Sequence, residues 1–188
     1  MIIMALDPAT NIGWAVYDIG TSTSHQRPSS IECGSFNLGK GSAFEKVKAV
    51  RALLPPLIKK YQPDFIVFEM PLSIIPKFEK KGKDLAGDTE TTTINAGTIL
   101  QLNRISGAVQ AVIEGFRIPC EEVRAQTRQS IIPKNIRADN PKKRAALFCD
   151  MLNIVGKNND ARDAAVIALW AAGRSQELKL KQMAENVP

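Results

Sequence analysis

Two short apolar runs, far apart in the chain, each end in an acidic residue. Ile2–Leu6 is followed by Asp7 and Pro8, and Phe65–Phe68 is followed by Glu69. Unbroken apolar runs of this length are typical of strands that helices cover on both faces. They predict an α/β fold. If the two strands are parallel neighbours, Asp7 and Glu69 emerge side by side at the carboxyl edge of the sheet, where open α/β sheets bind their ligands.

The residues after Asp7 predict a β-hairpin with a carboxylate at its tip. Asn11 and Gly13 favour a turn, and the β-prone run Trp14–Tyr17 follows them. We interpret Asp7 as a candidate metal ligand. Taken alone, an Asp-Pro pair after a strand most often only ends the strand, so the functional interpretation depends on other positions.

The composition is that of one globular domain. The 188 residues are 44% apolar, and no apolar stretch is long enough to cross a membrane. No basic segment precedes the first apolar run, so we expect no signal peptide and a cytoplasmic location. The three cysteines lack CxxC spacing, which argues against a disulfide framework and a zinc site. The net charge of +6 favours a polyanionic partner, nucleic acid before membrane.

The pattern after the hairpin predicts a strand and a helix. Ile31–Phe36 has the alternating character of a strand. Ser42, with Glu45 three residues later, predicts a capped helix, which should bend or end near Pro55 and Pro56.

The middle of the chain favours loops around a long helix. Gly20–Ser30 is polar and holds the only histidine, His25, which excludes a histidine-rich metal site. Pro71–Thr93 carries lysines and acids in near balance, and its length indicates a mobile surface loop. Ile94–Phe116 is apolar around much of its circumference, which predicts burial either in the core or against a twin subunit. Ile118–Val123 predicts the strand that closes this βαβ unit.

The most basic part of the chain follows that strand. Between positions 124 and 144, seven cations face a single anion, Asp139. A balanced surface would mix acids among the cations, so we favour a phosphate-backbone footprint over a merely solvated helix face. The predicted DNA-binding residues are Arg124, Arg128, Lys134, Arg137, Lys142, Lys143 and Arg144.

Two more acids open the last predicted helix, which runs from about Lys157 to about Lys179. Asp160 and Asp163 are three residues apart, so on a helix they face the same way. Capping by Asn159 or Asp160, with acids favoured in the first turn by the helix dipole, is a competing explanation. It does not explain why both acids precede an apolar face that would pack on the sheet.

If these elements pack as one unit, Asp7, Glu69, Asp160 and Asp163 converge. Two ionised carboxylates about 4 Å apart repel by on the order of 4 kcal/mol at an effective dielectric of about 20, so the cluster would hold protons or bind a cation. Oxygen ligands without histidine or cysteine suit Mg²⁺ or Mn²⁺. Two such ions would activate a water and stabilise the leaving 3′-oxygen of a phosphodiester, which is nuclease chemistry.

The ordered set of motifs resembles the RuvC family of Holliday junction resolvases. The motifs are Asp7-Pro8 with Gly13-Trp14, Glu69 after a strand introduced by Pro63-Asp64, and Asp160-Ala161-Arg162-Asp163-Ala164 at the start of the last helix. The likeness spans nearly the whole chain. It implies a ribonuclease H-like fold, a mixed central sheet flanked by helices, in a single nuclease domain covering residues 1–188.

The resemblance also implies an activity. It predicts a crossover junction endonuclease, a homodimer with one active site per subunit, which resolves four-way or other branched DNA by paired nicks. The implied catalytic residues and ligands of two Mg²⁺ ions, with Mn²⁺ as a substitute, are Asp7, Glu69, Asp160 and Asp163. The family's basic residues fall near Arg128 and Lys142 or Lys143. The implied location is the cytoplasm of a bacterium or of a phage-infected host, and nothing in the sequence identifies a partner helicase.

Three features depart from the family's pattern. Ala9 replaces the glycine that usually follows Asp-Pro, Leu72 stands where cellular members place an aromatic, and the charged stretch Lys77–Thr92 is longer than expected. These departures suit a phage-type member that cuts branched DNA broadly.

Three other functions compete with this interpretation. A resolvase-like RNA-processing nuclease would share the four acids, whereas a non-catalytic nucleic-acid-binding module would not need them. An actin-like kinase or ATPase also begins with an aspartate-bearing hairpin. That fold needs a second, duplicated domain and a glycine-rich adenosine motif, and this sequence has neither.

Overall fold

The computed structural model describes the chain except for five segments. The described residues are 1–20, 28–71, 77–83, 89–93 and 96–175. His25 and Leu72 lie outside them. In this described part, no helix is both long and apolar enough to cross a lipid bilayer. Cys33, Cys120 and Cys149 are free cysteines.

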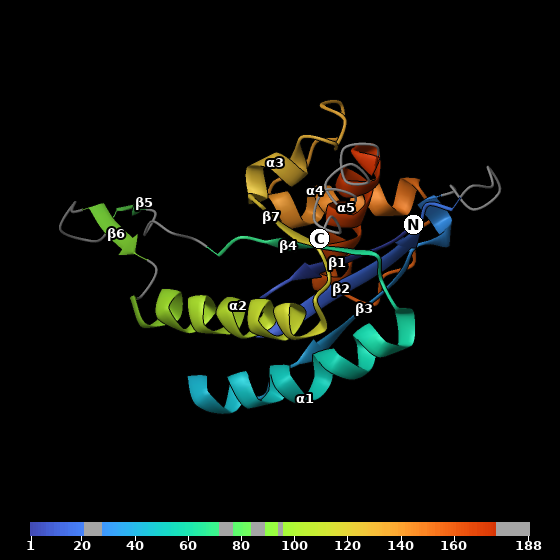
Figure 1. Ribbon diagram of the computed structural model, residues 1–188. Coiled ribbons are helices and arrows are strands. Elements are labelled where there is room, and N and C mark those ends of the chain that lie inside the picture. Colours follow the sequence, from blue (N-terminus) through green and yellow to red (C-terminus); the bar gives the residue numbers. More distant parts are fainter. Residues whose placement is uncertain (21–27, 72–76, 84–88, 94–95, 176–188) are drawn as a thin grey trace.

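The fold is built on a mixed five-stranded sheet (Figure 1). Its strands lie in the order β3 (Glu32–Asn37), β2 (Asn11–Asp18), β1 (Ile2–Asp7), β4 (Phe65–Glu69) and β7 (Cys120–Val123). β2 is antiparallel to both of its neighbours, whereas β4 is parallel to both β1 and β7. The predicted mixed sheet, the N-terminal hairpin and the two later strands are confirmed, but Asn11 and Gly13 lie in β2, and the turn falls before them at residues 8–10.

Each face of the sheet has its own layer of helices. Figure 1 shows α4 and α5 on one side of the sheet and α1 and α2 on the other. The helices are α1 (Ala43–Tyr61), α2 (Ala96–Phe116), α3 (Ala125–Gln129), α4 (Pro141–Met151) and α5 (Asn159–Gly173). Along β1, Ile3 and Ala5 pack in the α5 layer, whereas Met4 and Leu6 pack in the α1–α2 layer. Because both faces are covered, the strand sequence is apolar without interruption.

Helix α1 confirms the predicted cap and corrects the predicted end. The Ser42 hydroxyl accepts a hydrogen bond from the Glu45 N–H, and the Glu45 carboxylate accepts one from the Ser42 N–H at 2.6 Å. Pro55 and Pro56 lie inside the helix, which continues past them. The helix survives the two missing N–H donors because its inner face, including the fully buried Leu54, is packed against the sheet.

The stretch predicted as a mobile loop contains a second, small sheet. β5 (Lys77–Lys83) and β6 (Thr89–Thr93) pair in an antiparallel hairpin, which Figure 1 shows set apart from the main sheet. The loop prediction is therefore wrong for these residues. The threonines of β6 are β-branched and favour extended backbone, a preference that the charge balance of the stretch concealed.

Helix α2 is buried along one side only within the single chain. Ile105, Val109 and Ile113 are fully buried, whereas Leu100 is 61% exposed and Ala111 is also exposed. The predicted burial on more than one side is therefore not met inside one chain.

Helix α5 begins where an asparagine joins it to the sheet. The Asn158 side chain accepts a hydrogen bond from the Ala161 N–H at 2.9 Å and donates one to the Ser35 hydroxyl of β3 at 2.7 Å. Asn158 is therefore the N-cap, and the competing interpretation, in which Asn159 or Asp160 caps the helix, is wrong. The cap fixes the rotation of the helix, and with it the direction of its first side chains.

A glycine allows the first turn of α5 to contact the hairpin directly. Gly13 pairs with Asp7 across the β1–β2 ladder, and a Cβ at Gly13 would lie 2.0 Å from the Asp160 carbonyl oxygen. No side chain fits in that space unless the helix moves. The backbone of Asp160 therefore lies against the strand residue opposite Asp7.

Candidate active site

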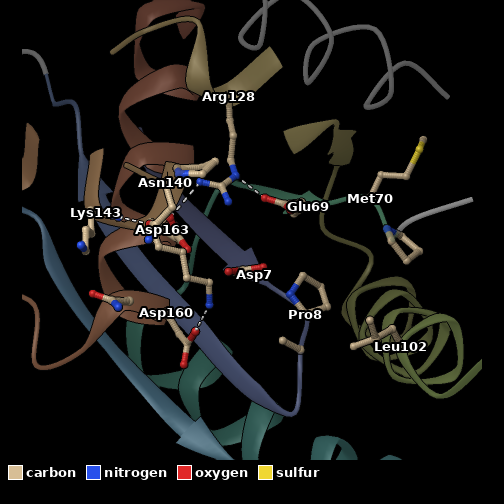
Figure 2. Close-up of a pocket in the computed structure, with 15 residues that line it drawn as sticks. Asp7, Pro8, Glu69, Met70, Leu102, Arg128, Asn140, Lys143, Asp160 and Asp163 are labelled. Carbon is tan, nitrogen blue, oxygen red and sulfur yellow. Dashed lines mark hydrogen bonds and ion pairs between the residues drawn. The ribbon is translucent and has the colours of Figure 1, made fainter. Parts of the chain in front are cut away.

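A cleft of about 800 Å³ opens at the carboxyl edge of the sheet (Figure 2). Asp7, Glu69, Asp160 and Asp163 all line it. They come from the ends of β1 and β4 and from the start of α5. The structure thus brings together the four acids that the sequence predicted would converge. Their roles in catalysis and metal binding stay predictions.

Asp7 and Glu69 are neighbours because of strand register. Leu6 pairs with Phe68 in the parallel β1–β4 ladder, so the next residue of each strand leaves the sheet at the same edge. Both side chains are half-buried, and that of Glu69 is 18% exposed. Both carboxylates are therefore partly shielded from water, and both still face the cleft.

Asp163 is hard to explain as a helix-capping residue. Its side chain is 3% exposed, and Asn158 already caps the helix. The helix dipole favours Asp160 in the first turn, but burying a carboxylate further along costs free energy unless the charge is compensated. The competing explanation from helix capping and the dipole therefore covers Asp160 and leaves Asp163 unexplained.

Two basic side chains pair with these acids inside the cleft. Arg128 is buried at the end of α3; its Nε donates to Glu69, and its Nη1 donates to Oδ1 of Asp163 at 3.1 Å (Figure 2). Lys142 Nζ donates to Oδ1 of Asp160 at 3.1 Å. Lys143 also lines the cleft but pairs with Asp139, so the four carboxylates outnumber the three cations when all four acids are ionised.

Burial and mutual repulsion raise the pKa values of the clustered acids. Burial, followed by the charge on Glu69, raises the pKa of Asp7 to about 7. Burial also raises the pKa of Glu69 and of Asp163, although the Arg128 charge opposes the rise at both. A cluster with these properties favours either protons or an added cation.

The raised pKa of Asp7 predicts a pH-dependent stability in metal-free buffer. The folded protein keeps the Asp7 proton up to about pH 7, whereas the unfolded chain loses it near 3.8, so the free energy of unfolding falls as the pH rises between these values. Asparagine resembles the protonated carboxyl. We therefore expect Asp7→Asn to be more stable than the wild type at pH 8, by on the order of a few kcal/mol, with the difference shrinking towards pH 4. Thermal unfolding in EDTA from pH 4 to 8 measures this, and a difference that does not change with pH would contradict it.

The donor set suits a hard divalent cation. The cleft offers carboxylate oxygens and no histidine or cysteine among its lining residues, as Mg²⁺ and Mn²⁺ prefer. Oδ2 of Asp163 is buried and has no hydrogen-bond partner in the described part of the chain, so it is an open acceptor. Within the same residues, no three acidic, cysteine or histidine side chains yet form a ready metal site. The residue types therefore suit Mg²⁺ or Mn²⁺. The ion pairs that the carboxylates make with Arg128 and Lys142 do not arrange them as a metal site.

An apolar wall on one side of the cleft was not expected from the sequence. Pro8, Met70, Pro71 and Leu102 form it, with Leu102 reaching in from α2 (Figure 2). No local pattern distinguishes Leu102 from the other apolar residues of its helix. Its place at the cleft follows from the packing of α2 on the sheet, which appears only in three dimensions.

The opposite wall is polar and belongs to the start of α4. Asn140 caps this helix, with its side-chain oxygen accepting from the Lys143 N–H at 2.8 Å, and Pro141 follows at the first helical position. Lys142 and Lys143 extend from the same turn. The Asn-Pro pair is a helix-start pattern that could have placed this wall from the sequence.

The seven predicted DNA-binding residues divide into three groups. Those that line the cleft are Arg128, Lys142 and Lys143. Those that are exposed elsewhere are Arg124, Lys134 and Arg137. The remaining one, Arg144, is half-buried and donates hydrogen bonds to three backbone carbonyls of the preceding loop. Arg128 and Arg144 thus differ from the exposed members of the basic segment, because internal carboxylates and carbonyls already hold their guanidinium groups.

No family model matches this sequence, and no curated protein sequence matches it either. Solved structures do match. The structure of Thermus thermophilus RuvC in complex with a Holliday junction substrate has a TM-score of 0.63 and 14% identity, over 94% of this chain and 96% of that chain. A second Thermus thermophilus RuvC structure has a TM-score of 0.61 and 16% identity, with the same coverage. The yeast mitochondrial Holliday junction resolvase Ydc2 has a TM-score of 0.50 and 12% identity, over 97% of this chain and 80% of that chain.

At these identities, the likeness is one of fold. It extends over nearly the full length of this chain and of the RuvC chains. It agrees with the mixed five-stranded sheet and its two helical layers. The chain therefore has the ribonuclease H-like fold of the RuvC-type Holliday junction resolvases.

Proposed function

We propose that the protein is a divalent-metal-dependent endonuclease that resolves Holliday junctions or other branched DNA by paired nicks. The observation that carries this proposal is the convergence of Asp7, Glu69, Asp160 and Asp163 at one cleft of a RuvC-type fold. Grouping partly buried acids opposes folding, so such a cluster indicates a functional site.

The four carboxylates would hold two Mg²⁺ ions, or Mn²⁺ in their place. When bound, these ions supply Lewis acidity that activates a water and stabilises the leaving oxygen of a phosphodiester. The cleft residues do the positioning. Asp7 and Glu69 are oriented by the sheet, and Asp160 and Asp163 are oriented by the capped start of α5. A cation beside Asp7 would favour the ionised form of this carboxyl.

The polar wall would bind the DNA backbone. The side chains of Lys142 and Lys143 are 59% and 63% exposed, and they pair with Asp160 in the cleft and with Asp139 at the surface. The Lys143–Asp139 pair is exposed and contributes little free energy, so this amine can exchange its carboxylate for a phosphate, whereas the partner of Lys142 is the cleft residue Asp160, which is 16% exposed. The apolar wall around Leu102 would face the sugar and base of the scissile nucleotide and exclude water from that side.

The charge of the chain and its structural neighbour support branched DNA as the substrate. The chain carries a net charge of +6. Thermus thermophilus RuvC was solved with a Holliday junction substrate bound. Paired nicks need two clefts, so the proposal includes a homodimer with one cleft in each chain, acting in the cytoplasm.

The proposal is tested by a digestion panel. Four-way, three-way and linear DNA and a structured RNA are incubated with the purified protein in Mg²⁺, in Mn²⁺ and in EDTA. We expect the four-way junction to be cut into nicked duplexes in either metal and to stay intact in EDTA.

The other outcomes assign the competing functions. Junction binding without cleavage in either metal would indicate a non-catalytic binding module. Preferential cutting of the RNA would indicate an RNA-processing nuclease. Equal cutting of linear and branched DNA would agree with the metal mechanism but would contradict the proposed preference for branched DNA.

A further inference from the structure

A single arginine connects two of the four acids. Arg128 is 5% exposed, and its guanidinium donates through Nε to Glu69 and through Nη1 to Asp163. Figure 2 shows this guanidinium directed into the cleft, with both contacts drawn. Glu69 and Asp163 belong to different elements, β4 and α5, so Arg128 connects them across the cleft.

The arginine is a permanent cation in a site that has too many negative charges. A guanidinium does not lose its proton in proteins, so Arg128 stays charged at any working pH. It compensates the charge of two buried or half-buried carboxylates, whose repulsion would otherwise oppose folding. It therefore supplies in the metal-free protein part of the positive charge that a bound ion would supply.

Arg128 and a metal ion compete for the same oxygens. The oxygens that accept from Arg128 belong to Glu69 and Asp163, two of the proposed metal ligands. No ready group of three ligands exists in the described part of the chain while these contacts are made, and Oδ2 of Asp163 is left without a partner there. A metal ion bound by both carboxylates would lie close to the guanidinium, and the repulsion between the two positive charges would favour departure of Arg128.

The segment that carries Arg128 is suited to release it. Helix α3 has five residues, and its N-cap residue, Arg124, makes no side-chain capping hydrogen bond. Lys142 and Lys143 line the same cleft, so a guanidinium that leaves the acids remains beside the wall that would bind phosphate.

We propose that Arg128 is a displaceable counter-ion of the carboxylate cluster, which lowers the affinity for divalent metal and leaves its carboxylate partners when metal binds. The inference rests on the proposed metal-binding function and goes beyond it, because it assigns Arg128 a role in metal loading. Displacement removes one positive charge from the acids and leaves it beside the polar wall. Metal binding would thereby also raise the affinity of the cleft for phosphate.

The test measures metal binding and stability, separately from cleavage. Mn²⁺ affinity is determined by calorimetry, and thermal unfolding is followed in EDTA and in Mn²⁺, for the wild type, Arg128→Gln, Arg128→Lys and Arg51→Gln. Arg51 is exposed on α1, so its variant controls for the loss of one positive charge. We expect Arg128→Gln to bind Mn²⁺ about tenfold more tightly than the wild type, to unfold at a lower temperature in EDTA, and to gain more from Mn²⁺.

The lysine variant keeps the test decisive if the glutamine variant does not fold. A lysine keeps the charge but lacks the planar fork that donates to two carboxylates at once, so Arg128→Lys should have an intermediate Mn²⁺ affinity. Wild-type affinity in both Arg128 variants, or weaker binding, would overturn the inference and leave the proposed function standing. Absence of Mn²⁺ binding in all four proteins would overturn the proposed metal site, and the inference with it.

Discussion

Replacing Asp7 with asparagine is expected to reduce cleavage of a four-way junction about a thousandfold or more while leaving junction binding intact. Asp7 lies at the end of β1 beside Glu69, and its side chain lines the cleft with the other three acids. Stabilisation of the reacting phosphate by metal ions contributes several kcal/mol, and each 1.36 kcal/mol corresponds to a factor of about ten in rate. Asparagine keeps the shape of the side chain and removes the charge that would hold the ions.

The measurement is single-turnover cleavage in Mg²⁺ together with a gel-shift assay in EDTA. Glu114→Gln is the matched control, because Glu114 is an exposed acid on α2 that does not line the cleft. Its cleavage rate should equal that of the wild type. Undiminished cleavage by the Asp7 variant would remove this residue from the metal site, and joint loss of cleavage and binding would indicate a wider role in the interface.

Replacing Gly13 with alanine is expected to lower the free energy of unfolding more than any other substitution proposed for this protein. The new Cβ would lie 2.0 Å from the carbonyl oxygen and 2.5 Å from the carbonyl carbon of Asp160, which are backbone atoms that cannot rotate away. Either α5 or the hairpin must move. An overpacked contact of this severity costs about 3 kcal/mol, which is a fall of roughly 6 to 12 °C in Tm for a chain of this length.

Thermal unfolding in EDTA measures this effect without any contribution from metal. Gly107→Ala is the control, since Gly107 is exposed on α2 and a Cβ there meets nothing within 4 Å. That variant should be as stable as the wild type or up to about 1 kcal/mol more stable, because alanine favours helix. If Gly13→Ala unfolds at the wild-type temperature, α5 does not contact the hairpin as described.

The elements nearest to the site were the most predictable. Strands covered on both faces must be apolar throughout, so Ile2–Leu6 and Phe65–Phe68 indicated their own burial. Their parallel pairing then placed Asp7 and Glu69 together. The shared direction of the two acids in α5 follows from their three-residue spacing on a helix, which can be seen in the local sequence.

The errors arose where tertiary contacts outweigh local preference. Pro55 and Pro56 do not end α1, because the inner face of the helix is packed on the sheet. The residues of β5 and β6 form a hairpin in spite of their charge. Asn158 caps α5 in preference to its neighbours because it also reaches Ser35 on another strand, a contact that sequence spacing does not reveal.

The burial of Arg128 could not be predicted from the sequence. In the sequence this arginine is one of seven cations, and the family resemblance places a basic residue near it, but neither observation indicates that it is buried. Its burial depends on α3 ending directly above two carboxylates from distant elements. A charge count along the chain finds the basic segment but does not separate a cation that would face phosphate from one that pairs with internal acids.

The arrangement of β1, β4 and α5 also has a consequence during synthesis. Asp7 and Glu69 leave the ribosome long before α5, which carries the other two acids. A nascent chain that still lacks α5 has half of its carboxylate set and no partner helix against Gly13. If the cluster binds metal as proposed, an unfinished chain would lack two of the four ligands, and the site would be complete only after α5 has packed against the first hairpin.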